Sequence, residues 1–82
     1  MKATMYYATW CGPCQATKAQ IKSDPELKKL VTPVDGERHK AAADAAKVQS
    51  YPTLVREDGV RRTGYQTAAA LRKWLGLPKV ST

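Results

Sequence analysis

Two cysteines separated only by a glycine and a proline are the feature that most restricts how this chain can fold. They are Cys11 and Cys14, the only cysteines among 82 residues. A bridge between them closes so short a loop that it contributes little to stability. Small secreted domains of this size usually depend on two or more disulfides. The fold must therefore come from a packed apolar core, and the cysteine pair indicates chemistry rather than scaffolding.

The composition is that of one small globular domain. Apolar residues make up 43% of the chain and charged residues 26%, which is not the composition of a disordered protein. We expect a single domain over residues 1–82. No apolar run approaches the roughly 18 residues of a membrane span, and the N-terminus lacks the apolar stretch of a secretory signal. The sequence therefore predicts a cytoplasmic protein without membrane contact.

The basic charge of the chain is dispersed. Lys and Arg number 14 against 7 Asp and Glu, a net charge of +7. The densest group is Arg56, Arg61 and Arg62, and no run of five or six basic residues occurs. This pattern favours a solvated basic surface, with a patch for an acidic partner as the alternative. It makes nucleic-acid binding unlikely as the main function.

The first half of the chain contains a strand, a helix and a second strand. Residues 2–8 are typical of a buried strand. Gly12-Pro13 opens a helix to about Lys22, with Cys14, Thr17 or Lys18, and Ile21 along one face. Asp24 is a helix N-cap before Pro25, and it starts a single turn. Residues 30–35 form a strand, which Pro33 assigns to a sheet edge or a bulge.

The second half adds a helix, a hairpin and a final helix. Residues 37–47 are an Ala-rich helix, and strands 53–56 and 60–63 are joined through Asp58-Gly59. The last helix starts at Thr67 as N-cap, and carries Leu71, Trp74 and Leu75 before Gly76 ends it. The predicted order is β-α-β-α-β-β-α. A right-handed crossover makes the first two strands parallel, which gives an α/β fold with a four-stranded mixed sheet.

The five residues Trp10-Cys11-Gly12-Pro13-Cys14 stand where the first strand meets the first helix. Tyr51-Pro52-Thr53 precedes a strand, and Gly64-Tyr65 precedes the last helix. On these segments the chain resembles the thioredoxin and glutaredoxin family over nearly its whole length. The Trp-Cys-Gly-Pro-Cys string is characteristic of thioredoxins, whereas the short length is similar to the minimal, glutaredoxin-like members. The resemblance implies a minimal thioredoxin fold.

The residues themselves explain how such a dithiol would react. Cys11 at a helix N-terminus meets free N–H groups and the positive end of the helix dipole, which favour a thiolate. Thiols in such positions have pKa values of roughly 3.5–7.5. We expect an exposed Cys11 to be the nucleophile and the deeper Cys14 to resolve the mixed disulfide. Gly12 lets a substrate backbone come close. Pro13 removes an N–H that would stabilise the thiolate, which favours reduction of disulfides.

The resemblance also implies a binding groove for an extended substrate. The peptide bond before Pro52 is expected to be cis and to lie against the dithiol, and the Tyr51 backbone to pair with the substrate. Trp10 is predicted to be a lid beside the dithiol, and Gly64 to keep the groove wall low. The alternatives are a trans proline opening a strand, a core tryptophan and a plain turn at Gly64.

Two departures from the family pattern affect the expected mechanism. In full thioredoxins a buried aspartate lies six residues before the first cysteine, and here that position is Met5. The proton acceptor for Cys14 is therefore missing or supplied by water. Glutathione-using members show a Gly-Gly-x-x-Asp element after the hairpin. This chain has Thr63-Gly64-Tyr65-Gln66-Thr67 instead, so the glutathione signature is absent.

These observations predict a protein-disulfide reductase that cycles between the dithiol and the Cys11–Cys14 disulfide. By resemblance, a thioredoxin reductase supplies the electrons, and the targets include enzymes such as ribonucleotide reductase. We expect a monomer without a bound cofactor, because the cysteines carry the electrons. Zinc is not expected, since it needs four ligands and His39 is the only histidine; that histidine is predicted to be solvated. The alternatives are a glutathione-dependent glutaredoxin, with or without an iron–sulfur cluster, and a redox-inactive binding module of the same fold.

Overall fold

The computed structural model describes residues 1–78 of the chain. The elements in this part are β1 (Ala3–Tyr7), α1 (Gly12–Lys22), α2 (Pro25–Leu30), β2 (Val31–Asp35), α3 (Lys40–Ala45), β3 (Thr53–Arg56), β4 (Arg61–Thr63) and α4 (Ala68–Trp74). This is the predicted order, with α2 as the short turn of helix expected after Asp24. The α/β class is confirmed.

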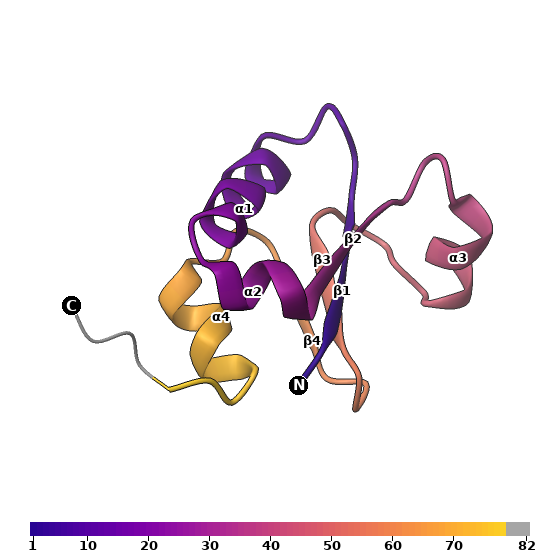
Figure 1. Ribbon diagram of the computed structural model, residues 1–82. Coiled ribbons are helices and arrows are strands. Elements are labelled where there is room, and N and C mark those ends of the chain that lie inside the picture. The colour runs from indigo at the N-terminus through magenta and orange to yellow at the C-terminus, as the bar shows by residue number, and fades with distance from the viewer. Residues whose placement is uncertain (79–82) are drawn as a thin grey trace.

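The four strands form one mixed sheet in the order β2-β1-β3-β4. β1 runs parallel to β2 and antiparallel to β3, and β4 pairs antiparallel with β3. β2 therefore lies at an edge, where the missing N–H of Pro33 is tolerated, as predicted. Helices α1, α2 and α4 lie on one side of the sheet and α3 on the other (Figure 1).

Local capping explains where the helices on the first side begin. The Asp24 carboxylate accepts the backbone N–H groups of Glu26 and Leu27, so α2 starts at Pro25 as predicted. Arg72 of α4 donates from Nη1 to Asp24 Oδ2 at 2.8 Å. This hydrogen bond lowers the pKa of Asp24. The same carboxylate thus caps α2 and ties it to α4.

The third helix is shorter than the sequence predicts. The Ala-rich pattern predicts a helix over residues 37–47, but α3 spans only Lys40–Ala45. Asp35 explains the late start, because its Oδ1 accepts the backbone N–H groups of Glu37 and Arg38 in a turn. His39, exposed as predicted, has a non-helical backbone. At the other end Lys47 has a φ of 57°, which stops the helix.

The hairpin and the last helix follow the turn residues in the sequence. Gly59 has a φ of 90° between β3 and β4, a conformation that suits glycine. The Thr67 hydroxyl accepts the N–H of Ala70 at 3.1 Å and caps α4, which confirms the predicted N-cap. The helix ends at Trp74, and Leu75 lies buried just beyond it.

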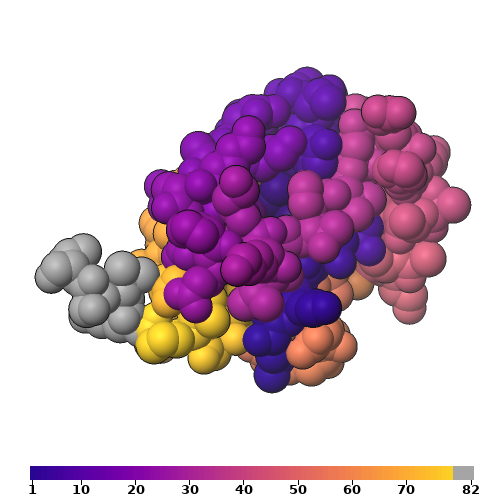
Figure 2. All heavy atoms as spheres, in the orientation of Figure 1, coloured from indigo at the N-terminus to yellow at the C-terminus, as the bar shows by residue number. Residues whose placement is uncertain are grey.

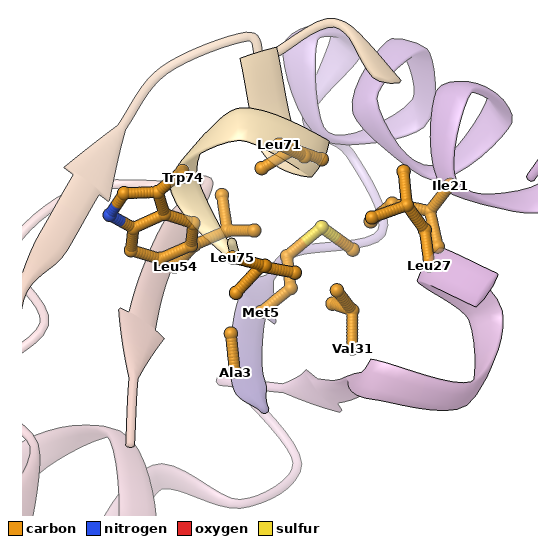
Figure 3. Close-up of a cluster of buried hydrophobic side chains, with 9 residues drawn as sticks. All are labelled: Ala3, Met5, Ile21, Leu27, Val31, Leu54, Leu71, Trp74 and Leu75. Atoms are coloured by element: carbon orange, nitrogen blue, oxygen red, sulfur yellow. The ribbon is translucent and has the colours of Figure 1, made fainter. Parts of the chain in front are cut away.

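Most of the buried apolar side chains among residues 1–78 fall into two clusters, one large and one small. The main core lies between the sheet and the helices α1, α2 and α4, with Met5 near its centre (Figure 3). Its members are Ala3, Met5, Ile21, Leu27, Val31, Leu54, Leu71, Trp74 and Leu75. The small cluster consists of Ala8, Cys11 and Cys14. Because the cysteines belong to the small cluster, they pack apart from the main core. Figure 2 shows α1 and α2 covering much of one face of the molecule.

Candidate active site

The turn between β1 and α1 places both cysteines at the start of a helix. Cys11 is the N-cap residue of α1, with an extended backbone, and its N–H donates to the carbonyl of Ala8 at 3.2 Å. The N–H of Cys14 donates to Cys11 Sγ at 3.1 Å. The two residues form a disulfide, with their Cα atoms 5.2 Å apart. The helix start thus directs an N–H group at the first sulfur.

The cysteines are more buried than the sequence suggests. Cys11 is 5% exposed and Cys14 is fully buried. The expectation of an exposed Cys11 is wrong, although Cys14 is the deeper of the two as expected. The reason is local packing: Ala8 is buried with the cysteines, and the partly buried rings of Tyr7 and Tyr51 pack against this cluster. The sequence order does not reveal that two aromatic rings from different segments meet there.

Tyr51 packs against the cysteine cluster, and Pro52 follows it in the chain. The peptide bond between them is cis. The Tyr51 ring meets Trp10 edge-on, with centroids 6.3 Å apart and planes at 79°. Trp10 itself is 70% exposed. The structure therefore places an exposed aromatic ring next to the cysteines, outside the core.

Two glycines leave open space around this group. A Cβ atom added at Gly12 or at Gly64 would meet nothing within 4 Å. Gly64 donates its N–H to the carbonyl of Pro52 at 3.0 Å and has a φ of 82°. That positive φ favours glycine whatever the space around it, so the backbone conformation is sufficient to account for glycine at this position. The structure thus places Gly64 against Pro52, while Gly12 and Pro13 lie between the cysteines.

Three residues around the site were not assigned a role from the sequence. The Thr17 hydroxyl, fully buried on α1, donates to the carbonyl of Pro13 at 2.9 Å and accepts from the N–H of Gln66 at 3.2 Å. Lys18 Nζ lies 3.8 Å from the centroid of the Tyr7 ring. Gly36 lies so close to the Tyr51 ring that it has no room for a side chain. For Thr17 the sequence offered one signal, its helical spacing from Cys14, which places it on the same face of the helix. For the contact of Lys18 with Tyr7 and the close approach of Gly36 to Tyr51 it offered none.

Ionisable groups with shifted pKa values lie outside this group. The hydrogen bond from Arg56 lowers the pKa of Asp58, in the hairpin, to about 2. Met5 belongs to the main core and not to the cysteine cluster. Among residues 1–78 no three His, Cys, Asp or Glu side chains gather as a metal ion would require. None of the helices in this part of the chain has the length and apolarity needed to cross a bilayer.

The matched family model covers almost the whole chain. Residues 2–77 match the model of the thioredoxin-like domain. The chain belongs to the thioredoxin-like domain family. A thioredoxin-like protein of Synechocystis sp. is 40% identical over 53 residues, which are 61% of this chain and 50% of that protein. Thioredoxin-1 of Drosophila melanogaster is 36% identical over 53 residues, with the same coverage of 61% and 50%.

Solved structures agree with this assignment. The structure of a mutant thioredoxin from Halobacterium salinarum superimposes with a TM-score of 0.76 at 30% identity, over 89% of this chain and 69% of that one. This thioredoxin-like domain nevertheless spans about half the length of the curated relatives it matches. The fold and family are therefore shared, and the Cys11–Cys14 disulfide lies at the spacing that the motif predicts.

Proposed function

We propose that this thioredoxin-like domain is a thiol–disulfide oxidoreductase that reduces disulfides in other proteins. The observation that carries the proposal is the Cys11–Cys14 disulfide at the N-terminus of α1, where the Cys14 N–H donates to Cys11 Sγ. An N–H directed at a sulfur favours its anionic form, which is both the nucleophile and the better leaving group. A disulfide serving stability alone would not require that placement.

The reaction consists of two exchanges of a sulfur–sulfur bond. The Cys11 thiolate attacks one sulfur of the target disulfide and forms a mixed disulfide, and the other target sulfur leaves as a thiolate that takes a proton from solvent. Cys14 then loses its proton and attacks Cys11 Sγ. The second target sulfur is released, and the Cys11–Cys14 bond forms. Two electrons have passed to the target, whose disulfide has become two thiols.

The surroundings of the disulfide support binding of an extended segment of the target. Trp10 is exposed next to Tyr51, and the positions of Gly12 and Gly64 are open. We assign to Trp10, Gly12, Pro13, Tyr51, Pro52 and Gly64 the contacts with the target. Water accepts the Cys14 proton in this proposal, because Met5 occupies the place of the family's buried acid and lies in the main core.

A thioredoxin reductase is the electron donor in this proposal, and the protein works as a monomer in a reducing compartment such as the cytoplasm. Proteins that form a disulfide in each turnover, such as ribonucleotide reductase, are the target class. No bound cofactor takes part. The absent Gly-Gly-x-x-Asp element is the reason to place glutathione second as a donor.

The first test is consumption of NADPH with insulin as the disulfide substrate. One assay is coupled through thioredoxin reductase and the other through glutathione and its reductase. Turnover with thioredoxin reductase alone is the expected result, and turnover with glutathione alone would make the protein a glutaredoxin. If neither assay shows turnover, and the protein also fails to reduce insulin with dithiothreitol as the donor, the redox-inactive binding module is favoured.

Two cysteine variants separate the proposed roles. Cys11→Ser should abolish turnover, because it removes the nucleophile. Cys14→Ser should accumulate a covalent adduct with the target, because the mixed disulfide is no longer resolved. Mass spectrometry under non-reducing conditions measures that adduct. An adduct formed by Cys11→Ser but not by Cys14→Ser would reverse the assignment.

A further inference from the structure

The buried hydroxyl of Thr17 connects the cysteine helix to the loop that follows β4. Thr17 lies on the inner face of α1, one helical turn after Cys14, and is fully buried. Its Oγ1 donates to the carbonyl of Pro13, inside the cysteine motif, and accepts the backbone N–H of Gln66. Because Gln66 supplies a hydrogen, the hydroxyl hydrogen must go to Pro13. Both hydrogen-bonding functions of the hydroxyl are therefore used.

The loop held by Thr17 makes backbone hydrogen bonds to two other segments of the chain. At one point the N–H of Gly64 donates to the carbonyl of Pro52 at 3.0 Å. At the other the N–H of Gln66 donates to Thr17 Oγ1 at 3.2 Å. Immediately afterwards Thr67 caps α4. The Thr17 hydroxyl thus links this loop to the cysteine helix.

We propose that Thr17 is a positioning residue that sets the distance between the cysteine helix and the Gly64–Gln66 loop, and so determines how well the protein binds an extended protein substrate. The inference rests on the proposed oxidoreductase function. It assigns Thr17 no contact with the substrate and no part in the sulfur chemistry. Its role is to hold the far wall of the groove at a fixed place relative to Cys11.

The side chain of Gln20 offers a matched control on the same helix. Gln20 Oε1 accepts the backbone N–H of Ala68 at 2.9 Å, so it also ties α1 to the segment around the start of α4. That tie lies beyond Gln66 and does not hold the Gly64 loop. Gln20→Met removes the acceptor and keeps the length of the side chain. It therefore tests whether any weakened contact between α1 and α4 has the effect expected for Thr17.

Thr17→Val keeps the shape of the side chain but removes the hydroxyl, and Thr17→Ser keeps the hydroxyl but removes the methyl group. The assay is insulin reduction driven by dithiothreitol, with KM and kcat measured separately, so that no reductase is needed. We expect Thr17→Val to raise KM about three- to tenfold, the effect of one net hydrogen bond, with kcat little changed. Thr17→Ser and Gln20→Met should keep the KM of the unaltered protein.

Two further readouts separate positioning from a merely structural role. The first is reduction of a small aromatic disulfide, 5,5′-dithiobis(2-nitrobenzoate), whose rate should not change in Thr17→Val because that substrate does not need the groove. The second is amide hydrogen exchange at Gln66, which should become faster in Thr17→Val and not in Thr17→Ser. This measurement does not depend on enzymatic activity.

Each failure has a distinct signature. An unchanged KM for insulin in Thr17→Val would overturn the inference, as would an equal loss with the small disulfide, which would mean that Thr17 acts on the cysteines. A rise in KM of the same size in Gln20→Met would assign the effect to general loosening of α1 against α4. If the unaltered protein does not accelerate insulin reduction at all, the proposed function fails, and the role of Thr17 in it fails too. Gln66 exchange would still show whether the hydrogen bond exists.

Discussion

The close approach of Gly36 to Tyr51 yields the sharpest prediction about this protein. A Cβ atom at Gly36 would lie 2.6 Å from Tyr51 Cε1 and 2.8 Å from Cζ, whereas non-bonded carbons are normally about 3.5–4.0 Å apart. The backbone cannot retreat freely, because the Gly36 N–H donates to the carbonyl of Tyr7 at 2.8 Å. In Gly36→Ala the Tyr51 ring must therefore move by about 1 Å.

This displacement should lower both stability and activity. Overpacking of this kind costs about 1–3 kcal/mol of the free energy of unfolding. The ring that moves is the one that packs against the cysteine cluster and meets Trp10. A shift of about 1 Å beside reacting groups lowers rates by as much as about a hundredfold. We expect insulin reduction by Gly36→Ala to fall about ten- to a hundredfold.

Urea denaturation measures the loss of stability, with the fluorescence of the buried Trp74 as one signal. Gly12→Ala is the matched control for stability, since its Cβ would meet nothing within 4 Å; it should not lower the free energy of unfolding. In the double variant Gly36→Ala/Tyr51→Ala the clash disappears. Its loss of unfolding free energy should therefore be about 1–3 kcal/mol smaller than the sum of the losses of the two single variants. Additive losses, or a Gly36→Ala protein within about 0.5 kcal/mol of the original, would refute this account.

Further predictions concern the contacts that hold the helices. Asp24→Ala should destabilise the protein more than Asp24→Asn does, because asparagine still caps α2 and only the pairing with Arg72 is lost; equal losses in urea denaturation would contradict this. Because the Asp24 pKa is lowered on folding, its contribution should be complete above its unfolded value of 3.8 and disappear as the pH falls through the lower folded value. Asp24→Asn should remove that pH dependence. If the free energy of unfolding of this variant still changed with pH at the same slope, the effect would belong to another group. Thr67→Ala should cost about 1 kcal/mol through loss of the α4 cap, which Thr67→Ser should largely restore. Leu71→Ala, at a fully buried position, should cost about 2–5 kcal/mol, and a loss below about 1 kcal/mol would show that α4 does not pack as described.

The parts of the fold that could be predicted from the sequence are those with local causes. Asp24 before Pro25 marks a helix start through hydrogen bonds within three residues, and Asp58-Gly59 marks a turn through backbone conformation. The edge position of β2 follows from the missing N–H of Pro33. These signals need no knowledge of the rest of the chain, and the structure confirms them.

The features that the sequence did not predict depend on contacts between distant segments or on competing local bonds. The α3 helix begins late because the Asp35 side chain takes two N–H groups that the pattern of alanines cannot reveal. Cys11 is buried because Tyr51, far along the chain, packs against its cluster. The hydrogen bond of Thr17 could not be predicted for the same reason, because its partner Gln66 is 49 residues away. Motif spacing locates the cysteines, but tertiary packing decides how their surroundings are built.

The separation of the cysteine cluster from the main core bears on how this protein can change over time. Opening and closing of the sulfur–sulfur bond moves atoms in a small group around Ala8, while the nine-residue core that holds sheet and helices together lies elsewhere. Tyr7 packs against both clusters and connects them. Substitutions around Ala8 therefore change the surroundings of the disulfide without replacing any member of the main core. In such an arrangement, changes to the surroundings of the disulfide and changes to the main core fall on largely different residues.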